Sequence, residues 1–420
     1  MSFQQGLSGL NVMSKNLDII GNNIANANTY GAKGSRAEFA DMYANALNGA
    51  GSTSIGIGVQ LASVSQQFTQ GNISATDNPM DVAINGGGFF QMTDGFSPIT
   101  YSRNGQFKVD SSGYIVNNQG LQLVGYRADT AGVIQPGLAV PLQLPTVGIE
   151  PQQTSTIDME FNLDSGSATT DPGAAVVPRI SFTNSNTYNK ATSLTAFDEK
   201  GQSVALTFYF QKSATDTWNV YVTANGTSVG GTPADPQPLT DLSFLANGKT
   251  PTPEELTFDI PASTNALGAE TLPITGINLS VAGSTQFGSS FGVTNLAQNG
   301  YAPGSLSAIV IESTGVITAR YSNGQSKPAG QVELATFRNM QGLQPVGGNG
   351  WQRTFGSGDP VVGTPGVGNI GVLQSGALEE SNVDLTGELV NMITAQRNYQ
   401  ANAQTIKTMD QVLQTLVNLR

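Results

Sequence analysis

Both ends of the chain carry apolar residues at the spacing of a coiled-coil seam, and nothing else in the sequence constrains the fold as strongly. Residues 2–27 show alternating spacings of four and three once Ser14 and Gly21 are counted as fillers between the apolar residues Phe3, Leu7, Leu10, Leu17 and Ile24. Residues 384–420 keep the same phase, with Gln396 and Asp410 as polar interruptions: Leu385, Leu389, Met392, Tyr399, Ala403, Ile406, Leu413 and Val417. The sequence therefore predicts two long terminal helices.

Each of these helices needs a partner for its apolar seam. The sequence between them has no helical period, so the only helical surface available to either one is the other helix or a neighbouring copy of the chain. The second stripe is long for a helix inside a globular domain. Asn382 or Asp384 is expected to cap this helix at its N-terminus. One alternative is that both helices pack on other parts of the same chain and bury their seams there. If the seams stay exposed in the single chain, they indicate assembly with other copies.

The composition predicts a surface that is polar but poor in charge. Charged residues make up 11 % of the chain, against about 25 % in an average soluble domain. Such a surface suits packing between subunits, because few charges lose their water when neighbours dock. A soluble secreted protein could have the same composition. The net charge of −12 and the lack of any basic run indicate no nucleic-acid partner.

The absence of cysteine and histidine narrows the possible chemistry. It excludes disulfides, thiolate nucleophiles, Ser-His-Asp triads and metal sites built on Cys or His. Residues 86–88 are three glycines, but no Lys-Ser or Lys-Thr pair of a phosphate-binding loop follows them. The acidic residues lack the spacing of a Ca²⁺ loop and are interpreted as solvated turns or a helix-terminal charge bias: Asp77, Asp81, Asp94, Asp110, Glu379 and Glu380. We therefore predict no catalytic, cofactor-binding or metal-binding residue, no cofactor and no small-molecule substrate.

Between the terminal helices the sequence indicates β structure. Short alternating runs are separated by turn dipeptides such as Asn104-Gly105, which are typical of hairpins. Residues 135–151 contain four prolines and are interpreted as a crossing between domains. A second alternating region covers residues 154–298. The hairpin style of the first region resumes near Leu306, as if an insertion interrupted one domain.

These patterns predict a mostly β multidomain fold with nested, discontinuous domains and paired N- and C-terminal α-helices that form a coiled coil. The predicted parts are a terminal helical coiled-coil domain (1–30 and 381–420), an extended connecting region (31–75 and 356–380), an inner β domain (76–147 and 299–355) and an inserted outer β domain (148–298). With both chain ends together, such a subunit can line a tube with its helices and present its β domains outward.

Long motifs lie at both ends of the chain and in the first β region. Residues 16–31 read Asn-Leu-Asp-Ile-Ile-Gly-Asn-Asn-Ile-Ala-Asn-Ala-Asn-Thr-Tyr-Gly, residues 381–385 read Ser-Asn-Val-Asp-Leu, and residues 101–107 read Tyr-Ser-Arg-Asn-Gly-Gln-Phe. Together with residues 388–408 and 118–126, they resemble the signatures of bacterial flagellar rod and hook proteins. Rod subunits of this family are shorter and lack a large outer domain. The inserted region therefore favours a hook protein over a distal rod-type subunit, which is the alternative.

The resemblance implies a function, a set of partners and a location. It implies a structural subunit of the bacterial flagellar hook that self-assembles into a flexible curved tube, transmits torque from the rod to the filament and catalyses no reaction. The implied partners are copies of itself, the hook cap, the distal rod and hook–filament junction proteins, and the flagellar type III export apparatus. The implied location is the extracellular hook at the basal body. An N-terminus without a basic residue before Lys15 agrees with export without a cleaved signal peptide.

Two other classes of function are weighed against this one. A secreted adhesin would use the inserted β domain to bind a host or sugar ligand. A hydrolase would use Asp and Glu as its acid–base pair, because the chain has no histidine or cysteine. The sequence shows no such pairing, so the seam residues named above are the predicted functional residues and their predicted role is self-assembly.

Overall fold

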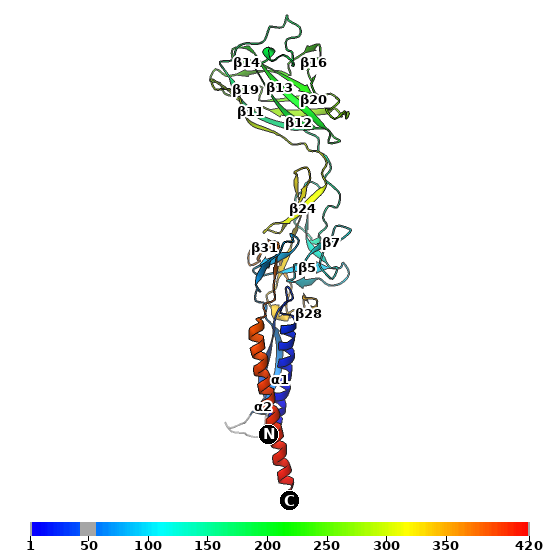
Figure 1. Cartoon of the computed structure of the whole chain (residues 1–420), viewed down its shortest axis with the longest axis vertical. Coiled ribbons are helices and arrows are strands. Elements are labelled where there is room, and N and C mark those ends of the chain that lie inside the picture. The colour runs from blue at the N-terminus through cyan, green and yellow to red at the C-terminus, as the bar shows by residue number, and fades with distance from the viewer. Residues whose placement is uncertain (1, 43–55, 419–420) are drawn as a thin grey trace. The chain divides into compact units, whose positions relative to one another are not determined.

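The computed structural model describes residues 2–42 and 56–418. Residue 1, residues 43–55 of the predicted connecting region and residues 419–420 of the predicted second helix lie outside the described residues. The chain divides into two compact units. Unit 1 comprises Met1–Thr146, Ser307–Arg320 and Ser326–Arg420, and unit 2 comprises Val147–Leu306 and Tyr321–Gln325. Strands predominate over helices (Figure 1), which confirms the mostly β fold class.

The α-helices α1 (Ser2–Ala25) and α2 (Leu385–Asn418) lie side by side in unit 1 (Figure 1) and run antiparallel. Gly6 of α1 faces Ile406 of α2, whereas Asn23, near the other end of α1, donates a hydrogen bond to Glu388. Asp384 caps α2, because its carboxylate accepts a hydrogen bond of 3.0 Å from the Thr386 N–H. The predicted pairing of the terminal helices is confirmed.

Unit 1 is built on a 13-stranded sheet whose strands come from both halves of the discontinuous unit. Its main path runs through β24 (Leu306–Ile311), β25 (Val316–Tyr321), β26 (Ser326–Val332), β9 (Gln122–Arg127), β5 (Phe89–Thr93), β6 (Thr100–Ser102), β29 (Gly350–Gln352) and β28 (Gln344–Gly347). The strands off this path are β7 (Lys108–Val109), β8 (Ile115–Val116), β10 (Val140–Pro141), β27 (Leu334–Thr336) and β30 (Val361–Gly363). A one-turn 3₁₀ helix, Met340–Gly342, precedes β28. β9 precedes the inserted unit 2 in the chain and β26 follows it, and their antiparallel pairing joins the two parts of unit 1 in one sheet.

Three two-stranded sheets join the helices to this sheet within unit 1. They pair β1 (Ser35–Met42) with β2 (Gly58–Gln66), β3 (Ile73–Ala75) with β32 (Ala377–Glu379), and β4 (Val82–Asn85) with β31 (Val372–Ser375). The β1–β2 pair packs along α1, where the Gln5 side-chain amide donates a hydrogen bond of 2.6 Å to the Gly56 carbonyl. The segments just after α1 and just before α2 are therefore held by β pairing.

Unit 2 consists of two main sheets that share one apolar core. One sheet contains β11 (Thr156–Asp164), β20 (Glu255–Ile260), β21 (Ile274–Ser280), β22 (Thr285–Phe287) and β23 (Gly292–Gln298). The other contains β12 (Lys190–Phe197), β13 (Ser203–Ala214), β14 (Thr217–Ala224), β15 (Thr227–Ser228), β18 (Thr240–Phe244) and β19 (Pro251–Thr252), while β16 (Gly231–Thr232) pairs with β17 (Asp235–Pro236). A 3₁₀ turn covers Ser185–Thr187. Alternate residues point inward, as for Phe161 and Phe210, whose ring centres are 4.6 Å apart.

The structure divides two of the predicted segments differently. The described residues of the predicted connecting region contain six strands, each paired with a partner that local sequence does not reveal: β1, β2, β3, β30, β31 and β32. Residues 299–306 belong with unit 2, since Tyr301 and Gly304 form β-bridges with Gln152 and Ile149. Two isolated antiparallel β-bridges thus join the segment that enters the inserted domain to the segment that leaves it.

Candidate assembly site

Two glycines let α1 and α2 approach each other closely. A methyl group at Gly6 would lie 3.1 Å from Ile406 Cγ1, and one at Gly9 would lie 2.8 Å from Asn402 Nδ2. Both distances are shorter than an ordinary van der Waals contact, so larger side chains here would push the helices apart. The seam inside the subunit therefore places α2 side chains against a glycine face of α1.

The residues predicted for self-assembly fall into two sets. Seven are partly buried: Leu10, Leu17, Ile24, Met392, Tyr399, Ala403 and Ile406. Six keep 44–75 % of their surface exposed: Phe3, Leu7, Leu385, Leu389, Leu413 and Val417. The heptad stripe thus does not coincide with the face that each helix buries in the single chain.

Sequence reasoning missed five buried residues among the described parts of the helices: Gly6, Val12, Ile20, Asn23 and Ala395. The reason is that α1 packs on the β1–β2 pair as well as on α2, as the hydrogen bond of 3.4 Å from the Val59 N–H to Ser8 Oγ illustrates. A helix with two packing faces does not follow a single heptad. The apolar Val12 and Ile20, eight residues apart, were the available signal for the second face.

The surface of α2 carries two groups of exposed apolar side chains. The proximal apolar group, near the start of the helix, consists of Leu385, Leu389, Val390 and Ile393, which are 44–58 % exposed. The distal apolar group consists of Val412, Leu413 and Val417, which are 51–75 % exposed. With Gly6 opposite Ile406, α2 extends past the described start of α1 by about 8 residues, or ~12 Å (Figure 1). The distal apolar group lies on this extension.

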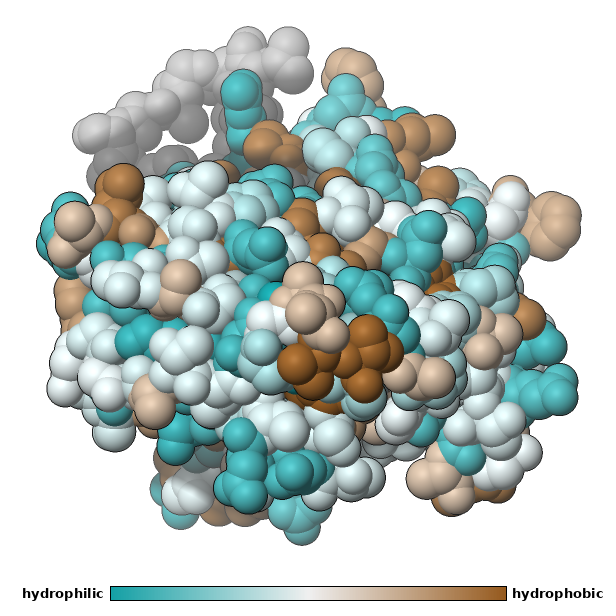
Figure 2. Space-filling model, turned by 90° about the horizontal axis from the view of Figure 1, so that it is seen from above, coloured by the Kyte–Doolittle hydropathy of each residue, from teal (hydrophilic) through white to brown (hydrophobic). Residues whose placement is uncertain are grey.

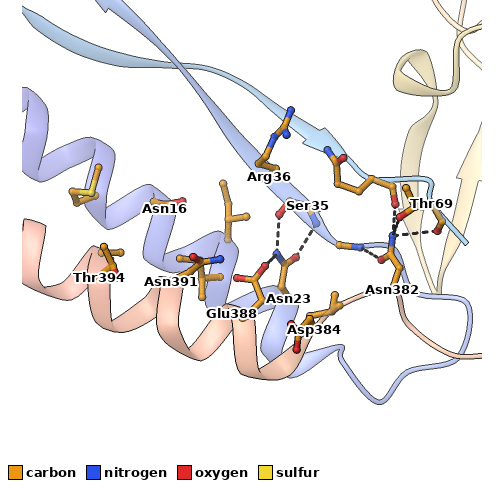
Figure 3. A pocket seen from close by; sticks show the side chains of 18 of the residues that line it. Asn16, Asn23, Ser35, Arg36, Thr69, Asn382, Asp384, Glu388, Asn391 and Thr394 are labelled. Atoms are coloured by element: carbon orange, nitrogen blue, oxygen red, sulfur yellow. Dashed lines mark hydrogen bonds between the residues drawn. The ribbon is translucent and has the colours of Figure 1, made fainter. Parts of the chain in front are cut away.

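A polar groove of about 600 Å³ lies between α1, α2 and the start of β1. Amide and hydroxyl side chains predominate in its lining, including Asn16, Asn391 and Thr394 (Figure 3). Glu388 also lines it: one carboxylate oxygen accepts from Asn23 Nδ2 at 3.2 Å, and the other is buried with no hydrogen-bond partner among the described residues. Across the part of the chain that the structure describes, no group of three or more acidic side chains could hold a metal ion.

Two asparagines fasten the helices to the chain that follows α1. Asn23 accepts a hydrogen bond from the Ser35 N–H and donates one to the Ser35 carbonyl, both at 2.8 Å (Figure 3). Asn382, just before α2, accepts one of 2.8 Å from the Gly34 N–H and donates one of 2.7 Å to the Gln67 carbonyl. Consecutive residues after α1 are therefore tied to α1 itself and to the start of α2.

Lys33, Arg103 and Glu379 form a buried cluster of charges, here called the charged joint. The Glu379 carboxylate lies 2.5 Å from Lys33 Nζ and 3.0 Å from Arg103 Nη1. Burial lowers the pKa of Lys33 and that of Arg103, and the neighbouring Glu379 carboxylate partly offsets the effect on both pKa values. The guanidinium carbon of Arg103 also lies 5.5 Å from the centre of the Phe89 ring.

The charged joint corrects one interpretation made from the sequence. Glu379 was grouped with solvated acidic residues, but it is 1 % exposed and paired with two cations. Its partners lie 276 and 346 residues away, so no local pattern indicates them. By contrast, Asp94 and Asp110 lie in turns, where their carboxylates accept backbone N–H groups, as predicted.

The mostly β fold and the exposed apolar surface of the paired helices are typical of a structural subunit of a larger assembly. None of the helices in the described part of the chain is long and apolar enough to cross a membrane.

Comparison with known proteins identifies the family. Four family models match: flagella basal body rod protein over residues 3–33, flagellar hook protein FlgE/F/G D1 domain over 83–202, flagellar basal body protein FlaE D2 domain over 162–301, and flagellar basal body rod FlgEFG protein C-terminal over 374–419. The chain is 44 % identical to the flagellar hook protein FlgE of Escherichia coli and 43 % identical to that of Salmonella typhimurium, with 100 % of each chain covered. A solved structure, the Helicobacter pylori flagellar hook protein FlgE2, aligns with a TM-score of 0.49 and 14 % identity over 73 % of this chain and 99 % of that chain. The chain belongs to the flagellar hook protein FlgE family and is a structural protein of the bacterial flagellum.

Proposed function

We propose that the chain polymerises through its terminal helices into a flexible, curved tube that transmits torque from the rod to the filament. The observation that carries this proposal is the proximal apolar group on α2, whose four side chains keep about half of their surface exposed. Full burial of a large apolar side chain contributes about 1.5–3 kcal/mol, so covering the exposed half of each one contributes roughly 1 kcal/mol. Four such side chains on every subunit therefore favour association with a neighbouring subunit that covers them.

The two sets of predicted assembly residues have different roles in this proposal. The partly buried set, including Met392 and Ile406, holds α1 and α2 together within one subunit. The exposed set, including Leu389 and Leu413, contacts neighbouring copies. The distal apolar group extends past the described start of α1 and so has room to pack against another subunit.

The β domains carry the outer part of the tube in this proposal, with the inserted domain outermost. Figure 2 shows a face of the molecule on which hydrophilic and weakly polar residues predominate and hydrophobic residues lie in small groups. A surface of this kind forms polar, weak contacts that can exchange while the tube bends. Bending then costs little, because no large apolar area has to be exposed to water at each turn of the shaft.

We further propose that the chain leaves the cell through the flagellar type III apparatus without a cleaved signal peptide. At the extracellular hook it would meet the hook cap, the distal rod proteins and the hook–filament junction proteins. It would catalyse no reaction there. The total lack of cysteine supports this route, because an unfolded chain in transit cannot form disulfide cross-links.

The test compares two substitutions on α2 by sedimentation, electron microscopy and circular dichroism. Leu389→Asp should leave the helical signal of the monomer unchanged and raise the critical concentration for polymerisation about tenfold or more, because a charge is buried in the contact. Ile406→Asp should weaken the helix pair inside the subunit as well, since Ile406 packs on Gly6. Leu267→Asp in unit 2 is the matched control, because Leu267 is 88 % exposed.

Curved tubes from the wild type and the control, and none from Leu389→Asp, would support the helix role. Equal polymerisation of Leu389→Asp and wild type would refute it. A wild-type chain that stays monomeric and binds a host or sugar ligand would instead favour an adhesin.

A further inference from the structure

We propose that Glu379 is a positioning residue for assembly, which fixes through Lys33 and Arg103 the direction in which the paired helices leave the main sheet of unit 1. The inference rests on the proposed assembly function, because it matters only if the helices must meet neighbours at a set angle. It concerns orientation and not the pairing of the helices with each other.

One carboxylate connects three separate parts of unit 1. Lys33 lies eight residues after the end of α1, Glu379 is the last residue of β32 and lies six residues before α2, and Arg103 directly follows β6 of the main sheet. Glu379 Oε1 accepts hydrogen bonds from Lys33 Nζ (2.5 Å) and from the Gly71 N–H (2.9 Å), and Oε2 accepts from Arg103 Nη1 (3.0 Å). The approach from α1, the approach to α2 and the sheet thus meet at a single side chain.

The same region is bound by main-chain contacts to the same residues. The Gly31 N–H donates a hydrogen bond of 2.8 Å to the Glu379 carbonyl. Lys33 Nζ donates to the Thr69 carbonyl, and Arg103 Nη2 donates to the Gly86 carbonyl, both at 2.8 Å. Charge-assisted hydrogen bonds are directional, so together these bonds fix the angle between the helix pair and the main sheet. Their net contribution to the free energy of unfolding is small, because burying the charges costs free energy.

The charge balance makes Glu379 the critical member. Its side chain and that of Lys33 are 0 % exposed, and that of Arg103 is 5 % exposed. Two cations therefore share one anion away from water. Removing the carboxylate leaves two buried cations facing each other, and they regain hydration only if the segments separate. Removing Lys33 instead leaves a balanced Arg103–Glu379 pair, so its loss is tolerated better.

The helices would stay paired if the charged joint opened. Asn23 and Ser35 link α1 to the start of β1, Asn382 links the start of α2 to Gly34, and none of these bonds involves the joint. An open joint should therefore leave the helices paired and widen the range of angles between the helix pair and the sheet, within the limits set by bonds such as that from Asn349 Nδ2 to the Tyr30 carbonyl. This outcome distinguishes a positioning role from a general loss of stability.

The experiment measures this direction by spin labelling. The native chain has no cysteine, so Ser112→Cys in an exposed turn of the main sheet and Gln404→Cys on the exposed face of α2 give a unique label pair. Glu379→Gln should broaden the distance distribution about twofold or more, leave the helical circular dichroism unchanged and raise the critical concentration about tenfold or more. Lys33→Met should do the same to a smaller degree.

The control is a second ion pair, placed in unit 2. Arg179 Nη2 lies 2.5 Å from Asp171 Oδ2, and Arg179→Met should change neither the distance distribution nor the critical concentration. A triple variant that combines Lys33→Met, Arg103→Met and Glu379→Met replaces the three charges with apolar side chains. It should fold and show the broad distribution.

Three results would overturn the proposal: a narrow distribution in Glu379→Gln, a narrow distribution in the triple Met variant, or a broad distribution with unaltered polymerisation. The emission of Trp351 in a Trp218→Phe background reports whether Glu379→Gln unfolds unit 1. If it does, the distance distribution of Lys33→Met tests the proposal instead. An unchanged distribution in that variant refutes the role. Failure of the assembly function is seen separately, as equal polymerisation of wild type and Leu389→Asp.

Discussion

The close contact between α1 and α2 makes a quantitative prediction for Gly6→Ala. In an isolated helix, replacing Gly with Ala stabilises by about 0.5–1 kcal/mol, because Gly loses more backbone entropy. The new methyl group would lie 3.1 Å from Ile406 Cγ1, a few tenths of an ångström too close, which costs about 1–2 kcal/mol. The two effects nearly cancel, so Gly6→Ala should change the stability of the helix pair little or lower it slightly.

A double-mutant cycle separates the two effects. In an Ile406→Ala background the overlap is gone, and Gly6→Ala should then stabilise by about 0.5–1 kcal/mol, so the coupling energy equals the overlap cost of about 1–2 kcal/mol. Gly21→Ala is the control, because Gly21 lies in α1 with nothing within 4 Å of a new methyl group, and it should stabilise equally in both backgrounds. The assay is denaturant unfolding followed by helical circular dichroism. A coupling energy near zero would mean that Gly6 and Ile406 are not in contact.

Two further predictions concern the β structure of unit 1. The hydrogen bond of 2.6 Å to Glu333 raises the pKa of Tyr126 to about 12 from 10.0, so its stabilising contribution is complete below pH 10 and is lost as the pH rises through about 12. Because the tyrosine is partly exposed, Tyr126→Phe should lower the free energy of unfolding by only about 1 kcal/mol at neutral pH. It should also reduce the loss of stability above pH 10, and an unchanged stability–pH curve would contradict this. Gly105→Ala would place a methyl group 1.7 Å from the Val82 carbonyl oxygen and should cost about 3 kcal/mol in urea unfolding, whereas Gly137→Ala, with open space around it, should be neutral. Equal midpoints for these two glycine variants would be inconsistent with the close approach of Gly105 to the start of β4.

The joint region illustrates what sequence reasoning could and could not reach. Asp384 was one of two expected caps for α2, because capping depends on residues within one turn of the helix start. The other, Asn382, instead binds Gly34 and Gln67, far away in the sequence. Glu379 gave no signal of its buried role. A carboxylate near the start of a helix is usually solvated. Glu379 is buried only because two cationic side chains from distant parts of the sequence pair with it.

The features that depend on neighbouring residues could be predicted without the structure: two terminal helices with apolar stripes, β hairpins between them, and an inserted second β region. Periodicity and turn chemistry act over a few residues, so they can be read from one segment at a time. Which face of each helix is buried depends on packing between distant segments, because α1 divides its surface between α2 and the β1–β2 pair. Only the tertiary structure brings Lys33, Arg103 and Glu379 together, since ion pairing depends on distance in space and burial, which the spacing of residues along the chain does not specify.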